Sequence, residues 1–255
     1  MYTINNLWNN DNVKVLEKDE NMGYSVIEFQ RDLSIMSPQE AMSKYFMAEM
    51  GAKEKTAVLE LDGSREWTLS AGAMKLMIGD VKSKTNVKGV GDLFGKTVKA
   101  SVSGETIIKP VYTGKGCVVL ENTFRHIVPL DISEWGGKIV MNDSLYLASS
   151  GLDVSVERIK SLSGMALGGE GLFNTCVKGS KGVLLIESPK PREELVEVVL
   201  NNDVIKVDGN NAICWSSGLD FTVERTTKTL IGSAASGEGL VNVFRGTGKV
   251  LLYLN

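Results

Sequence analysis

Three glutamates that follow glycines come closest to a functional motif in this 255-residue chain. Glu170 and Glu238 are the centres of Gly-Glu-Gly triplets, and Glu105 also follows a glycine. If the segments around them are related by symmetry, the three carboxylates could form a ring that binds a cation or a basic partner. The alternative is a structural turn, in which glycine supplies a positive φ and the carboxylate accepts hydrogen bonds from backbone N–H groups. We favour the turn, because a feature that recurs in every repeat is typical of a fold determinant.

The most basic stretch covers residues 81–99 and includes Lys88 and Lys96. A lysine cluster is the best local place for an anionic partner, although a solvated loop is the interpretation we favour. Residues 89–95 are rich in glycine but lack the spacing of a dinucleotide-binding loop, and no apolar strand precedes them. The sequence therefore predicts no cofactor.

The residues that most often act as catalysts or metal ligands are few and scattered. His126 is the only histidine, and no nucleophile lies near it in the sequence, so we expect a structural histidine rather than part of a catalytic triad. Cys117, Cys176 and Cys214 are far apart, and their spacing fits neither a zinc site nor a disulfide framework. We therefore expect no metal site and no enzymatic activity.

Composition restricts the partners and the location. A net charge of -3 and a pI of about 5.4 give no general attraction to nucleic acid or to an anionic membrane. The first residues lack the basic start and apolar run of a signal peptide, and no later apolar run is long enough to span a bilayer. We expect a cytoplasmic protein without a transmembrane segment.

One segment of the chain occurs twice with little change. Residues 149–158 and 216–225 differ only where Val154 and Ser155 are replaced by Phe221 and Thr222. A more divergent copy precedes them. The predicted organisation is an N-terminal arm with a capped helix (1–52), a first repeat with a basic glycine-rich insertion (53–122), a second repeat (123–188) and a third repeat (189–255).

Within these repeats, short strands are separated by glycine turns. Leu219, Phe221 and Val223 alternate with polar residues, which places one face of a strand on a core. Residues 183–186 are apolar throughout and should be covered on both faces. The pattern predicts an all-β fold built from three repeated, jelly-roll-like β-sandwich units.

A single helix is predicted at about 38–50. Ser37 and Glu40 form a capping box around Pro38, which is favoured at the first helical position, and Gly51 can end the helix. The apolar residues that share one face are Met42, Tyr45, Phe46 and Met50. We expect this face to cover the sheet, and the alternative is a methionine-rich surface that binds a partner.

Two kinds of segment indicate a family resemblance. Each Gly-Glu-Gly triplet is followed by an apolar strand, a glycine-rich turn and another apolar strand, and the chain also contains the segment KGVGDLFGK. With these segments the chain strongly resembles the family named after altered inheritance of mitochondria, member twenty-four, over about residues 53–255. The resemblance implies a fold like that of the tryptophan RNA-binding attenuation protein, a jelly-roll β-sandwich repeated in one chain and often assembled into oligomers. It implies no reaction.

Our preferred hypothesis is a non-catalytic β-scaffold that forms homo-oligomers and binds a small molecule or another protein. The candidate contact residues are Glu105, Glu170, Glu238, Lys88 and Lys96. RNA binding by analogy of fold is the first alternative, and an uncharacterised enzyme is the second.

Overall fold

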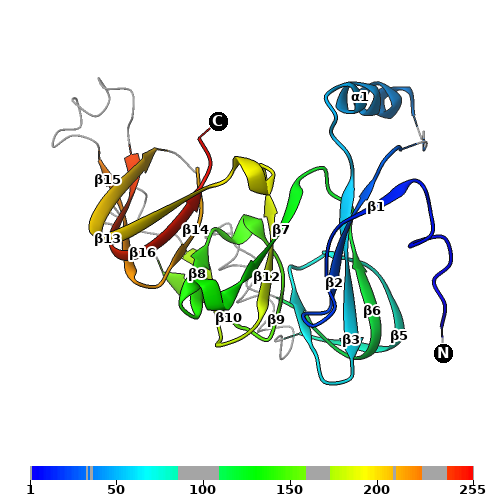
Figure 1. The fold of residues 1–255 in the computed structure, drawn as a ribbon, viewed down its shortest axis with the longest axis horizontal. Coiled ribbons are helices and arrows are strands. Elements are labelled where there is room, and N and C mark those ends of the chain that lie inside the picture. Colours follow the sequence, from blue (N-terminus) through cyan, green and yellow to red (C-terminus); the bar gives the residue numbers. More distant parts are fainter. Residues whose placement is uncertain are drawn as a thin grey trace, which may run out of the picture.

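The computed structural model describes residues 2–32, 34, 37–85, 109–158, 173–208, 211–225 and 240–254. These residues form two antiparallel sheets and one α-helix, which confirms an all-β fold with a single helix (Figure 1). The N-terminal strands lie at one end of the molecule and the C-terminal strands at the other, with the strands of the predicted second repeat between them.

The larger sheet, sheet A, has nine strands in the order β1-β2-β3-β6-β4-β9-β12-β7, with β5 paired to β6. Its strands are β1 (Val13–Asp19), β2 (Tyr24–Phe29), β3 (Lys55–Asp62), β4 (Trp67–Leu69), β5 (Met74–Lys84), β6 (Val111–Leu120), β7 (His126–Asp131), β9 (Tyr146–Ser150) and β12 (Val183–Ser188). Sheet A curls, so that Lys55 at the start of β3 forms an antiparallel bridge with Thr123, just before β7 at the far end of the strand order.

The smaller sheet, sheet B, has seven strands in the order β10-β11-β8-β14-β16-β13, with β15 paired to β16. Its strands are β8 (Lys138–Met141), β10 (Asp153–Arg158), β11 (Phe173–Lys178), β13 (Val196–Asp208), β14 (Ala212–Ser216), β15 (Leu219–Arg225) and β16 (Leu240–Leu252). Three short 3-10 helices, η1 (Ile132–Trp135), η2 (Asp143–Leu145) and η3 (Arg192–Glu194), occur between strands. The predicted second repeat contributes strands to both sheets and so joins them.

The strand β12 shows how this join is packed. Val183 and Leu185 belong to an apolar cluster enclosed by sheet A, whereas Leu184 and Ile186 belong to a second cluster shared with sheet B. All four side chains are at most 3 % exposed. The prediction that residues 183–186 are covered on both faces is therefore confirmed, because β12 lies between two cores.

Two strands of sheet A differ from the predictions. β1 lies inside the segment predicted as a polar arm, yet it is hydrogen-bonded to β2 along its length. β5 continues through residues 81–84, which were predicted to begin the basic insertion, and there it pairs with β6 from Val81 opposite Gly114 to Lys84 opposite Val111. Both strands are mostly exposed at the surface, so their side chains carry no apolar pattern.

The helix α1 (Pro38–Glu49) begins as predicted but packs differently. The Ser37 hydroxyl accepts a hydrogen bond from the Glu40 N–H at 3.1 Å, and Gly51 has φ +72° after the last turn. The expectation that its apolar face covers the sheet is wrong, since Tyr45 and Phe46 are 60 % and 58 % exposed and none of the helix residues is buried (Figure 1). In the part of the chain that the structure describes, no helix has the length and apolar character needed to cross a membrane.

A buried ion pair lies between the two sheets. The Lys109 Nζ lies 2.5 Å from the Asp143 Oδ1 in η2, and the Thr175 hydroxyl of β11 also donates to this carboxylate oxygen. The same ammonium lies 4.4 Å from the ring centroid of Tyr146 in β9. Lys109 and Asp143 are 7 % and 6 % exposed. The pair therefore connects the segment before β6 with elements of the second repeat.

A candidate binding cleft at the open seam of sheet A

The curl of sheet A leaves a seam between β7 and the N-terminal strands. The seam is closed at one point, where the Lys55 N–H donates to the Thr123 carbonyl at 2.8 Å and the Thr123 N–H donates back at 2.9 Å. Beyond that bridge β7 has β12 as its ladder partner, and β1 has β2. A cleft of about 610 Å³ occupies the gap, and we call it the seam cleft.

The seam cleft has an apolar floor and a charged rim. Its floor consists of side chains that belong to the sheet A cores or lie beside them, namely Tyr24, Val26, Ile127, Val128 and Val183. The rim carries the charged residues Lys14, Glu17, Asp19, Asp131, Glu134, Arg192 and Glu193. Because the floor side chains are at most 7 % exposed, the surface of the seam cleft is more polar than apolar, and charged groups dominate its rim.

Several rim carboxylates are already hydrogen-bonded inside the protein. Glu17 accepts a hydrogen bond from the Tyr24 hydroxyl at 2.8 Å, and burial together with this bond raises the pKa of Tyr24 above its usual range. Asp131 caps η1 by accepting from the Ser133 N–H and hydroxyl, and these bonds lower the pKa of Asp131. These carboxylates thus shape the site.

The remaining rim charges are available to a ligand. Within the described ranges, no ion pair involves Lys14, Arg192, Glu134 or Glu193. The rim therefore offers charges of both signs above an apolar floor.

The edge of β7 that faces the cleft is blocked against strand pairing. Pro129 has no N–H to donate, and proline in a sheet is confined to positions where the missing donor faces an edge. The Arg192 Nη1 lies 3.5 Å from the Pro129 carbonyl oxygen and partly covers it. A polypeptide in the cleft would therefore be held by its side chains rather than by adding a strand to β7.

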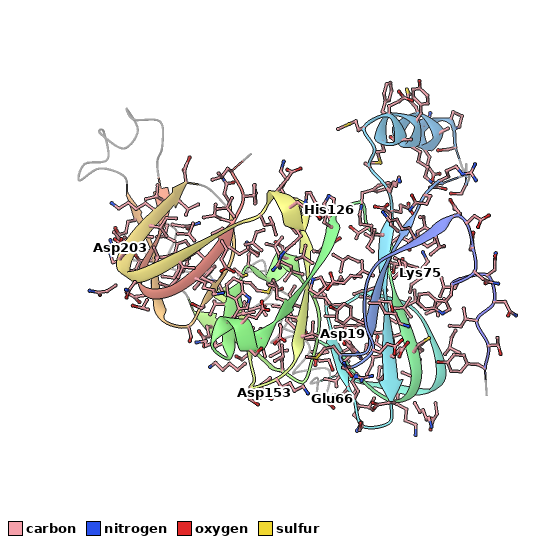
Figure 2. All side chains as sticks on the ribbon, in the orientation of Figure 1. Asp19, Glu66, Lys75, His126, Asp153 and Asp203 are labelled. Carbon is pink, nitrogen blue, oxygen red and sulfur yellow. The ribbon has the colours of Figure 1, made fainter. Side chains whose placement is uncertain are left out.

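His126 lies at the closed end of the cleft, at the start of β7 (Figure 2). Burial, followed by the neighbouring Lys55 ammonium, lowers the pKa of His126. Lys55 is 5 % exposed, donates to the Lys53 carbonyl at 2.9 Å and lies 3.5 Å from a Glu28 carboxylate oxygen. The imidazole is therefore neutral at pH 7 and can both donate and accept a hydrogen bond.

We expect His126 to make the stability depend on pH just below neutrality. Because the pKa is lower in the folded than in the unfolded chain, the unfolded chain binds more protons between the folded value and about 6.5. The free energy of unfolding should therefore fall as the pH drops from about 7 towards the folded pKa. Urea unfolding at several pH values, compared with His126→Gln, measures this effect. An unchanged slope in the variant would contradict the assignment, and NMR titration of the single histidine gives the folded pKa directly.

The candidate contact residues from the sequence, Glu105, Glu170, Glu238, Lys88 and Lys96, all lie outside the described residues. Their grouping stays a prediction. Among the described residues, no cluster of three or more His, Cys, Asp or Glu side chains could hold a metal ion.

The three cysteines are buried and free. Burial raises the pKa of Cys176 to about 11 and raises the pKa values of Cys117 and Cys214 as well, which disfavours the reactive thiolate form.

Sequence reasoning singled out His126 but missed its neighbours in the cleft. Lys14 and Tyr24 come from the successive strands β1 and β2, whereas Arg192 comes from η3, which lies far later in the chain. No residue spacing in the sequence indicated that these residues would meet.

Comparisons with known proteins identify relatives of unknown function. A family model described as mitochondrial biogenesis AIM24 matches residues 49–253. An uncharacterised protein of Streptococcus pyogenes serotype M6 is 27 % identical over 202 residues, covering 76 % of this chain and 79 % of the relative. An X-ray crystal structure of a Streptococcus pyogenes protein, solved by a structural genomics consortium, is 26 % identical with a TM-score of 0.58, covering 80 % of this chain and 88 % of that chain.

Proposed function

We propose that this chain, which belongs to the mitochondrial biogenesis AIM24 family, is a non-catalytic β-scaffold that self-associates and binds a short peptide segment of a partner protein in the seam cleft. The matched relatives are uncharacterised, so the proposal rests on the geometry of this chain. A fold like that of the attenuation protein stays a prediction.

The composition of the seam cleft is the observation that supports a peptide ligand. Leu16, Ile127 and Val183 offer apolar surface, and within the described residues the rim carries charges of both signs that form no ion pair. A peptide can present apolar side chains downward and charged side chains of either sign to the rim. Binding through buried apolar contacts surrounded by a polar rim is the common arrangement of protein interfaces.

Selection from a random peptide library on the immobilised protein tests the proposal. The selected peptides should combine apolar residues with charges of both signs, and binding should move the NMR signals of His126. Leu16→Asp in the cleft should weaken their binding about tenfold or more, because it places a charge beside the apolar ligand surface. Leu16 is 42 % exposed, so the variant should fold.

The matched control is Leu76→Asp on β5. Leu76 is 40 % exposed and does not line the cleft, so peptide binding should persist in this variant. The ligand proposal fails if no peptide is enriched, or if the enriched peptides bind both variants equally and leave His126 unchanged.

A further inference from the structure

The strand β13 is an edge of sheet B. Over its 13 residues it pairs with β16, and it stands last in the strand order of the described sheet (Figure 1). Unlike the edge of β7, it contains no proline. An unprotected edge presents a row of backbone donors and acceptors that can pair with another strand.

A bulge divides β13 into two segments, and each segment has an exposed valine on the same face of the sheet. The register shifts between Leu200 and Asp203, where Asn202 has φ +51°. An extra residue in one strand reverses which face the following side chains occupy. As a result Val199 before the bulge and Val204 after it are both exposed, by 66 % and 46 %.

The backbone of both valines also points to the free edge. The Lys249 N–H donates to the Ser216 hydroxyl at 2.9 Å, away from β13, so Val199 opposite Lys249 is not in a hydrogen-bonded pair with β16. The Val204 N–H donates to the Asp203 carboxylate at 2.8 Å. Asp203 lies at the end of the molecule farthest from the N-terminal strands (Figure 2).

We propose that β13 pairs antiparallel with β13 of a second copy about a two-fold axis at the bulge, with Val199 opposite the partner's Val204. This inference rests on the self-association in the proposed function and assigns its surface. In this register the paired valines have their side chains on the same face of the sheet, and their backbone groups are directed towards the partner strand. In the dimer, the Val204 N–H exchanges the Asp203 carboxylate for a carbonyl of the partner strand.

Charge complementarity favours this register over registers in which the two β13 strands are shifted along each other. It places Glu197 opposite the partner's Lys206, twice in each dimer because of the two-fold axis. Opposite charges on facing positions of antiparallel strands are stabilising, and like charges are destabilising. Glu197 already lies 3.0 Å from Lys249 on the neighbouring strand, so three alternating charges would cross the joined sheet.

Charge reversal tests the pairing. A single edge contact is small for a protein interface, so we expect a dimer that forms between about 1 μM and 1 mM in sedimentation velocity. Glu197→Lys and Lys206→Glu should each weaken dimerisation about tenfold or more, since each replaces two attractive contacts by two repulsive ones. The double variant E197K/K206E re-forms both cross-strand pairs and should restore most of the affinity, although the lysine at position 197 then lies beside Lys249.

Glu49→Lys on α1 makes the same charge change away from β13 and should leave the dimer intact. If an assembly forms and its affinity is unchanged by Glu197→Lys, by Lys206→Glu and by the double variant, this register is wrong and self-association uses another surface. A monomer at every concentration overturns self-association as a whole, while the peptide proposal is still decided separately by the Leu16 and Leu76 variants.

Discussion

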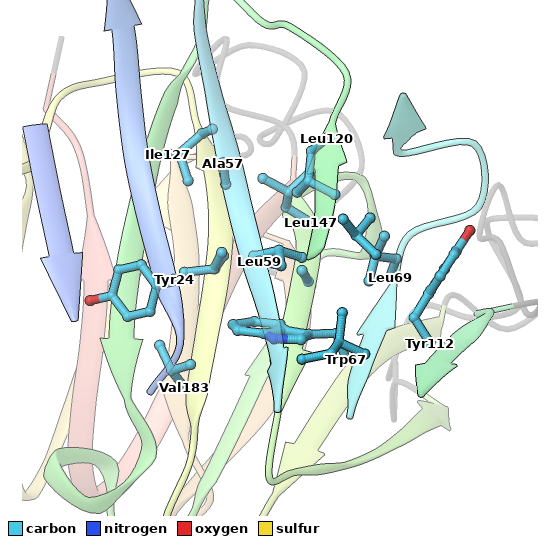
Figure 3. Packing of buried hydrophobic residues seen from close by; sticks show 14 of the residues in the cluster. Tyr24, Ala57, Leu59, Trp67, Leu69, Tyr112, Leu120, Ile127, Leu147 and Val183 are labelled. Carbon is cyan, nitrogen blue, oxygen red and sulfur yellow. The ribbon is translucent and has the colours of Figure 1, made fainter. Parts of the chain in front are cut away.

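Replacing Trp67 by alanine is expected to lower the free energy of unfolding by about 3 to 5 kcal/mol. Trp67 is fully buried in the sheet A core, where it lies near Leu59 and Leu69 (Figure 3). Its indole N–H donates to the Glu60 carbonyl at 3.2 Å, so the alanine variant leaves a cavity and also loses this hydrogen bond. Urea unfolding followed by circular dichroism measures the loss.

The position of Trp67 explains why the loss should spread beyond its own strand. β4 is three residues long and lies between β6 and β9, so it links the first and second predicted repeats through a few ladder pairs. Trp67→Phe keeps much of the apolar volume and should cost less than the alanine variant.

Trp8→Ala is the matched control. Trp8 is 46 % exposed, and its removal should change the unfolding free energy little. Equal losses for the alanine variants at Trp67 and Trp8 would contradict the assignment of Trp67 to the core.

The repeated strands were predictable because their side chains face defined surroundings. The alternation of Leu219, Phe221 and Val223 corresponds to β15: Leu219 and Phe221 contribute to or contact the core formed with Trp215 and Phe244, and Val223 is buried. The two faces of β12 were predictable for the same reason. Where burial restricts a position to apolar residues, the pattern of apolar and polar residues in the sequence predicts the strand.

In the N-terminal region the pattern of apolar and polar residues predicted less of the structure. β1 is held to β2 by backbone hydrogen bonds while most of its side chains are exposed, so almost any residue type is acceptable there. The capping box identified the start of α1, because capping is a local interaction. The amphipathic pattern identified an apolar face but could not indicate what covers it, and Tyr45 and Phe46 are exposed.

The seam cleft could not be predicted from residue spacing. It exists because sheet A curls until Lys55 meets Thr123, which brings β1, β7 and η3 around one hollow. The curl of a sheet depends on the twist that accumulates over all its strands, and no local sequence motif predicts that sum. His126 was predicted to be a structural histidine, and that role stays a prediction; its proximity to Lys55 follows from the same bridge.

Removing the carboxylate of Asp143 should lower the free energy of unfolding by about 3 kcal/mol. The variant Asp143→Ala leaves the Lys109 ammonium and the Thr175 hydroxyl buried without the carboxylate oxygen that both contact. Because the pair is buried, the loss should persist in 1 M salt, where the Debye length is about 3 Å. Urea unfolding at low and high salt measures it.

Two comparisons separate a buried ion pair from ordinary packing. The double variant Lys109→Met/Asp143→Leu removes both charges and keeps apolar volume, so it should be more stable than Asp143→Ala alone. Glu20→Ala breaks the exposed pair with Lys18, whose side chains are 46 % and 77 % exposed for Lys18 and Glu20, and should have little effect at any salt concentration. If Asp143→Ala behaves like Glu20→Ala, the ion pair does not stabilise the junction between the sheets. If the double variant is as unstable as the single one, the cost comes from lost packing around η2 rather than from a buried charge.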